Sequence, residues 1–97
     1  MKVQQMTNAK GTPVKNQFIL YDGEHTYFQS YNSIIVHQYC PRKDMNNLSV
    51  ASKVTLDETY WNYSRTTSKY RNLFLGESTQ ETQRKIDTGE YQLVNLN

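Results

Sequence analysis

Residues 17–31, QFILYDGEHTYFQSY, contain the clearest local structural pattern in the chain. Its first part, residues 17–21, contains aromatic and β-branched side chains that favour strands. Asp22 and Gly23 follow as a pair typical of a tight hairpin turn, and residues 26–31 return as a second strand-forming run. This stretch therefore predicts a β-hairpin.

Outward from the hairpin, the sequence predicts two more strands. Residues 34–39 form an apolar run that Pro41 ends, because proline cannot donate a hydrogen bond to the sheet. A polar loop over 41–49 precedes a fourth strand at 53–56, where β-branched side chains recur. The expected arrangement is an antiparallel meander.

A helix is expected after the meander. Tyr70, Leu73 and Phe74 lie at the spacing of one helix face and predict a helix over about 67–75, with Gly76 just beyond its end.

The junction before this helix is open to two interpretations. Residues 60–63 can continue the fourth strand, and either Thr66 or Thr67 can serve as the helix N-cap. Strand and helix patterns therefore compete over this short segment.

A second helix is predicted from a capping box. Ser78 is the N-cap of that box, Glu81 is its third helical residue, and Gly89 ends the helix. Residues 91–96 then close the chain as a strand. The order β-β-β-β-α-α-β predicts an α+β fold, with an antiparallel sheet of about five strands and two short helices packed on one face.

Length and composition limit the class of protein. The 97 residues allow one small domain, and a hydrophobic share of 36% allows a modest core. Residues 1–16 lack hydrophobic periodicity and predict a flexible N-terminal arm that could add an edge strand, while residues 17–97 form a single α+β domain. No apolar leader or long apolar run is present, which predicts a small soluble cytoplasmic protein without a membrane partner.

The sequence offers little material for catalysis. His37 and Cys40 form an H-x-x-C pair, and His25 is the only other soft ligand, so the set is too small for a metal site. The chain has no glycine-rich phosphate-binding motif, and its net charge of +2 does not by itself indicate a polyanion partner. We therefore predict no metal, no cofactor and no catalytic residue, and a protein that is not an enzyme.

One segment, residues 60–72, combines aromatic, cationic and hydroxyl side chains without an acid. Lysine and arginine neutralise phosphates, threonines at a helix start can hold an anion, and tyrosine rings can stack on bases. The candidate residues for binding nucleic acid or another partner are Tyr60, Tyr63, Arg65, Thr66, Thr67, Lys69 and Arg71. The alternative stays open that Trp61, Tyr63, Tyr70 and Phe74 belong to the core and that the cations only solvate the helix.

Two blocks of sequence carry a resemblance. One is F-x-S-Y-x-S-x-I at 28–35, and the other is Y-S-x-T-T-S-K at 63–69, which leads to F-L-G at 74–76. With these blocks the chain resembles, over about residues 17–97, small uncharacterised proteins encoded by bacteriophages and related mobile elements. The resemblance implies a protein made in the cytoplasm of a bacterial host. Residues 40–52 look like an insertion of variable sequence, where no site is expected.

These observations lead to two hypotheses about function. The first is a non-enzymatic phage-type accessory protein that binds nucleic acid through residues 60–72. The alternative is a protein-binding inhibitor or modulator of a host bacterial enzyme or defence system, because tyrosine, tryptophan and arginine also dominate protein interfaces. A homodimer through an edge strand is a further structural hypothesis.

Overall fold

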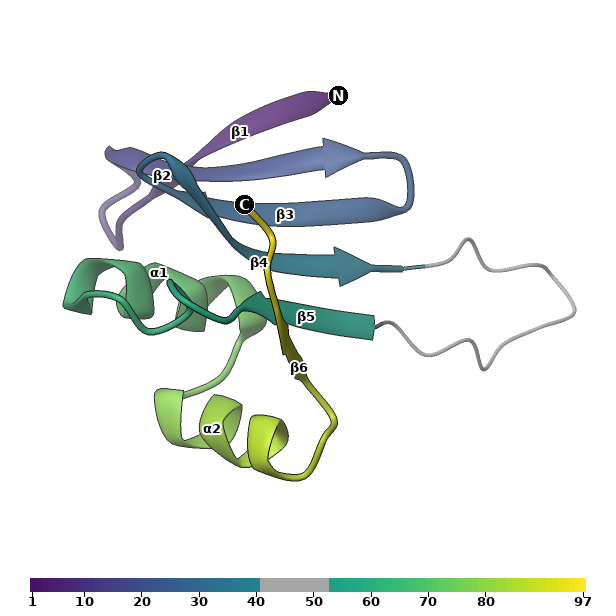
Figure 1. The fold of residues 1–97 in the computed structure, drawn as a ribbon. Helices are drawn as coiled ribbons and strands as arrows, with labels where there is room; N and C mark the ends of the chain where they lie inside the picture. The colour runs from purple at the N-terminus through teal and green to yellow at the C-terminus, as the bar shows by residue number, and fades with distance from the viewer. Residues whose placement is uncertain (41–52) are drawn as a thin grey trace, which may run out of the picture.

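The computed structural model describes residues 1–40 and 53–97, which form one six-stranded sheet and two helices (Figure 1). The elements are β1 (Lys2–Thr7), β2 (Pro13–Asp22), β3 (His25–Ser30), β4 (Ser33–Tyr39), β5 (Lys53–Asp57), α1 (Arg65–Leu75), α2 (Thr79–Asp87) and β6 (Gln92–Val94). The predicted α+β class is confirmed. The loop expected at 41–49, and the insertion at 40–52 apart from Cys40, lie outside the described residues.

The strands lie in the sheet in the order of the sequence, from β1 to β6. The first four neighbouring pairs are antiparallel, and the connections of the first three are too short for a parallel crossover. The last pair, β5 and β6, is parallel, which differs from the antiparallel arrangement expected for the closing strand. Two helices stand between these strands, and a connection of that length can return the chain to the end of the sheet from which it started.

The edge strand β1 arises from residues without a hydrophobic pattern. It pairs with β2, with Val3 opposite Leu20, and Met6 is its only buried residue. Because nearly all of its side chains are exposed, the sequence of β1 lacks the alternation of apolar and polar residues that marks a half-buried strand. The first 16 residues thus include the edge strand that the sequence allowed for. β2 begins within them and continues without a break through residue 17, where the domain was predicted to begin. Their flexibility stays a prediction.

The start of α1 differs from the prediction by two residues. Ser64 is the N-cap, and its Oγ accepts a hydrogen bond from the amide of Thr67 at 3.1 Å. Thr66 and Thr67, the expected caps, therefore lie inside the helix. The C-terminal end of α1 lies where the sequence predicts it. Gly76 follows the last helical residue with a φ of 70°, and its amide donates a hydrogen bond to the carbonyl of Asn72 in the last turn.

The link from β5 to α1 is a series of turns, so the strand continuation considered for residues 60–63 is wrong. Asp57 provides the physical reason. Its Oδ2 accepts hydrogen bonds from the amides of Thr59 at 3.0 Å and Tyr60 at 2.8 Å. An aspartate that binds the amides two and three residues ahead closes a turn, so the chain leaves the sheet directly after β5.

The second helix forms where its capping box predicts it. The amide of Glu81 donates to Ser78 Oγ at 3.2 Å, and the amide of Ser78 donates to Glu81 Oε1 at 3.3 Å. This reciprocal pair fixes the start of α2, which ends at Asp87, before the left-handed Gly89.

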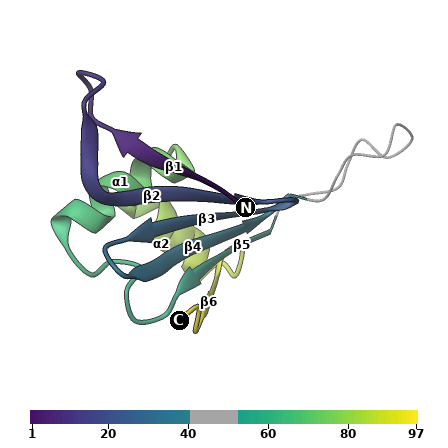
Figure 2. The ribbon, with the colours of Figure 1, turned by 90° about the horizontal axis from the view of Figure 1, so that it is seen from above.

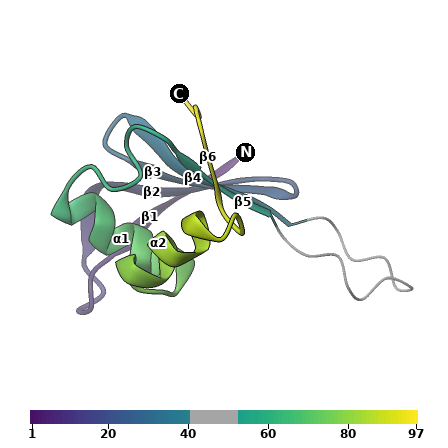
Figure 3. The same ribbon diagram turned by 60° about the horizontal axis from the view of Figure 1, so that its bottom comes forward.

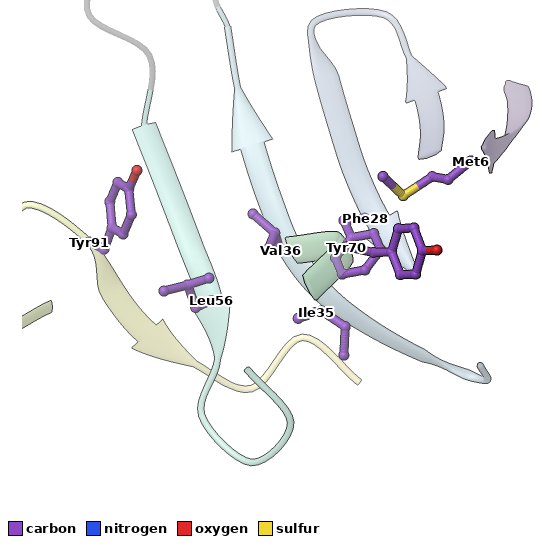
Figure 4. Packing of buried hydrophobic residues seen from close by; sticks show 7 residues of the cluster. All are labelled: Met6, Phe28, Ile35, Val36, Leu56, Tyr70 and Tyr91. Carbon is purple, nitrogen blue, oxygen red and sulfur yellow. The ribbon is translucent and has the colours of Figure 1, made fainter. Parts of the chain in front are cut away.

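Both helices pack on the same face of the sheet, as two rotated views show (Figures 2 and 3). The core lies between the helices and the sheet, and both Tyr70 from α1 and Phe28 from β3 belong to it (Figure 4). The Phe28 and Phe74 rings are also in contact, with centroids 5.9 Å apart. The buried hydrophobic residues are Met6, Phe28, Ile35, Val36, Leu56, Tyr70 and Tyr91. This packing decides which side chains of α1 remain free for a partner.

Candidate functional site

The structure divides the seven candidate residues between the interior and the surface. Thr67 and Arg71 point into the protein and are buried, since they lie on the same face of α1 as Tyr70. The other helical candidates, Arg65, Thr66 and Lys69, are exposed. In the preceding loop, Tyr60 is half-buried, whereas Tyr63 has 67% of its surface exposed.

Arg71 is fully buried, with 0% of its surface exposed. Its guanidinium donates hydrogen bonds to the carbonyl of Trp61 and to the side chains of Asn62, Asn72 and Thr79. It also lies 5.1 Å from the centre of the Trp61 ring. Burial lowers the pKa of Arg71, and nearby Glu77 opposes that change. These contacts tie the loop before α1 to both helices, which is a structural role.

The exposed cations border a groove of about 650 Å³ on the outer side of α1, which we call the outer groove. It is lined by Arg65, Ser68, Lys69, Asn72, Leu73, Gly76 and Glu77. Arg65 and Lys69 are four residues apart, so both side chains lie on one helix face. In residues 1–40 and 53–97, ion pairs join Lys85 to Glu77 and to Glu90, and neither groove cation takes part in one.

Glu77 brings one carboxylate to the outer groove, but this carboxylate already accepts hydrogen bonds from other side chains of the protein. Its side chain is 4% exposed and accepts hydrogen bonds from Tyr91, Thr82 and Lys85. Burial alone would raise the pKa of Glu77, but these hydrogen bonds and the charge of Lys85 lower it overall. The same contacts act on Tyr91, whose burial and proximity to Glu77 raise its pKa to about 12. This cluster fastens α2 and the start of β6 to the end of α1.

A second cavity, of about 550 Å³, lies at the other side of the α1 start. It forms where the β3–β4 turn comes beside the loop that follows β5 (Figure 3). We call it the tyrosine pocket, and its lining consists of Ser30, Tyr31, Asn32, Ser33, Ile35, Tyr60, Tyr63, Ser64 and Thr67. At its base, Ser30 Oγ and Thr67 Oγ1 are 2.9 Å apart and hydrogen-bonded.

The residues that β3 and β4 contribute to this pocket are not among the candidates predicted from the sequence. One sequence signal for the pocket was available in the two blocks that carry the resemblance. These blocks, 28–35 and 63–69, are the two segments that meet here. A cavity assembled from segments thirty residues apart becomes visible only once the chain is folded.

The two histidines lie away from both cavities. His25 Nδ1 and His37 Nε2 are 2.8 Å apart on neighbouring strands, and the Tyr27 ring stacks on His37 with centroids 4.8 Å apart. Burial, and then the neighbouring His25, lower the pKa of His37. Cys40 is exposed. Over the part of the chain that the structure describes, no three His, Cys, Asp or Glu side chains gather as metal ligands.

Comparison with known proteins identifies the family. A model for a family of unknown function, DUF8033, matches residues 1–90. The chain belongs to this family. The match includes every residue of the outer groove and of the tyrosine pocket. A search of curated proteins and a search of solved structures each returned no significant match.

The two helices can also be compared with the length and hydropathy that a membrane span requires. Neither α1 nor α2, the helices found in the described residues, is long and apolar enough to cross a bilayer.

Proposed function

We propose that this member of DUF8033 is a non-enzymatic accessory protein that binds nucleic acid through Tyr63, Arg65 and Lys69. The observation that supports this proposal most is the exposure of both cations on one face of α1, whose first turn contains no acidic residue. Cationic side chains that have no carboxylate partner are available to phosphates.

Each side chain would have a distinct part in binding. Arg65 offers a planar fork of donors that can bind a phosphate through two hydrogen bonds, and Lys69 adds a point charge one turn further along. Tyr63, largely exposed in the preceding loop, offers a ring on which a base can stack. Two cations give weak and salt-sensitive binding, because each neutralised phosphate releases a condensed counterion.

The double substitution Arg65→Gln with Lys69→Gln is expected to weaken binding of a single-stranded oligonucleotide at low salt by about tenfold. Two fewer phosphate contacts should also make the slope of log affinity against log salt shallower by about 1.4. Fluorescence anisotropy with a labelled oligonucleotide across a salt series measures both quantities. The melting temperature should barely change, since isolated surface charges contribute little to stability.

A matched control removes one arginine and one lysine elsewhere. Arg84 and Lys53 are both exposed, on α2 and β5, and line neither the outer groove nor the tyrosine pocket. Arg84→Gln with Lys53→Gln removes the same net charge and should change the affinity far less. Equal losses in the two double variants would contradict a localised interface.

A second candidate function is supported by the free edge of the sheet. Among the residues that the structure describes, β1 has a strand on one side only, and Val3 on it is 59% exposed. An exposed edge can accept a strand from another chain, so β1 is a candidate contact for a second copy or for a bacterial host protein. The resemblance to small bacteriophage proteins supports a phage-type origin and with it such a host partner.

Sedimentation velocity over a hundredfold range of micromolar concentrations tests the homodimer. If copies pair through β1, the sedimentation coefficient should rise with concentration. Val3→Lys should abolish the rise, because edge lysines oppose strand pairing. A wild-type protein that stays monomeric over this range rules out the dimer.

A further inference from the structure

The tyrosine pocket has the size of a small-molecule site and borders the proposed phosphate contacts. Its volume of about 550 Å³ falls within the range of cavities that hold small ligands. Ser64, which lines it, directly precedes Arg65 of the outer groove. A chain that places phosphates on Arg65 and Lys69 therefore has this pocket within reach of an adjoining nucleotide.

The walls of the pocket suit a flat aromatic ligand. Tyr31 and Tyr63 are 45% and 67% exposed, so each leaves a large part of its surface uncovered. Tyr60 packs edge-on against Tyr63, with ring centroids 5.6 Å apart, and holds that wall in place. Ile35 also lines the pocket, but it is 1% exposed and belongs to the core beneath. Rings of this kind stack on any base, because every base has a flat π-face.

The polar groups of the pocket are uncharged. Among the residues that the structure describes, its lining contains hydroxyl groups and one amide but no charged side chain. Ser30 and Ser64 both already bond to Thr67, which leaves Asn32, Ser33 and the tyrosine hydroxyls to meet a ligand. Such groups both donate and accept hydrogen bonds, so they suit the edge of a base better than a phosphate.

Tyr31 is held in a backbone conformation that bulky residues rarely adopt. Its φ is 57°, at the first position of a two-residue hairpin turn where glycine is usual. Its amide donates to the carbonyl of Asn16 at 2.7 Å, and Gln29 Nε2 donates to its carbonyl at 2.9 Å. Strain of this kind gathers at ligand sites, and here it places a tyrosine ring on the pocket where a glycine would leave the turn relaxed.

From these features we infer that the tyrosine pocket binds an unpaired nucleobase, stacked against Tyr31 and Tyr63, while Arg65 and Lys69 hold the adjoining phosphates. This inference rests on the proposed function and narrows its ligand to single-stranded nucleic acid. Bases in a duplex are already stacked and paired, so they cannot enter the pocket without being flipped out.

The experiment compares two single-stranded probes of equal length, a thymidine oligonucleotide and a chain of abasic sites with the same phosphates. Their affinities at low salt are measured by anisotropy, and the ratio isolates the contribution of the bases. The wild-type protein should prefer the thymidine chain by roughly tenfold. Tyr31→Gly and Tyr63→Ala should each bring the ratio toward one. The melting temperature of Tyr31→Gly should be equal to or above that of the wild type, since glycine relaxes the turn.

Two control variants separate this inference from the proposed function. Tyr39→Ala removes a tyrosine at the far end of β4 and should leave the ratio unchanged. Arg65→Gln with Lys69→Gln should weaken both probes by one common factor, again with an unchanged ratio. Equal wild-type affinities for the two probes, or a ratio unaffected by both pocket variants, would overturn the inference and the stacking role of Tyr63, and would leave standing the phosphate contacts of Arg65 and Lys69. A wild-type protein that binds neither probe contradicts both.

Discussion

Replacing Arg71 by leucine is expected to lower the free energy of unfolding by about 3 kcal/mol. The guanidinium is fully buried and bonds to a backbone carbonyl and to three polar side chains. Leucine fills part of the space but pairs with none of these groups, and a buried acceptor without a partner costs about 1–3 kcal/mol. Urea denaturation of the variant and the wild type measures the difference.

Arg65→Leu is the matched control, because it makes the same change on the exposed face of the same helix. It should alter the free energy of unfolding by less than about 0.5 kcal/mol while weakening oligonucleotide binding. The reverse outcome, a stable Arg71→Leu protein that has lost binding, would make Arg71 part of the site and contradict its structural role.

Replacing Asp57 by alanine is expected to cost about 3 kcal/mol as well. One carboxylate oxygen binds the two amides that start the turn after β5. The other, Oδ1, accepts from the amide of Leu96 at 2.9 Å and from Asn97 Nδ2 at 3.0 Å. Asp57 therefore shapes the loop that carries Tyr60 and Tyr63 of the pocket and also anchors the C-terminal residues. Asp57→Asn, which keeps one acceptor oxygen, should lose less stability in the same denaturation experiment.

Asp57 also predicts a pH dependence. Burial alone would raise the pKa of Asp57, but the hydrogen bonds from Leu96, Tyr60, Asn97 and Thr59 lower it below the ordinary value of 3.8. A carboxyl whose pKa is lower in the folded state than in the unfolded state contributes its full stability above the unfolded value. That contribution should be lost as the pH falls below about 4 and through the folded pKa. In Asp57→Ala this part of the acid transition should disappear.

The sequence carries enough local information for most of the fold. The hairpin at residues 17–31 and the capping box at Ser78 are short patterns with one favoured structure, and both form. β1 could be predicted only as a possible edge strand, because Met6 is its only buried residue. Tertiary pairing rather than a local pattern forms this strand. The direction of β6 depends on how two helices pack on the sheet, which no local pattern encodes.

The candidate site could be predicted only as a segment. Composition marks residues 60–72 as basic and aromatic but does not say which cations point outward. Arg65 and Lys69 lie on a different face of α1 from Arg71, and the packing of the helix against the sheet decides which face is buried. Tyr31 could not be assigned to the site, because its nearness to Tyr63 depends on the packing of α1 against the sheet.

The most direct test of the account is an amide chemical-shift titration of the ¹⁵N-labelled protein with a thymidine oligonucleotide at low salt. If the protein binds single-stranded nucleic acid where we propose, the largest shifts will fall in two segments, 30–33 and 63–69, and will fade as salt is added. Shifts confined to β1, or spectra that do not change, would contradict the account.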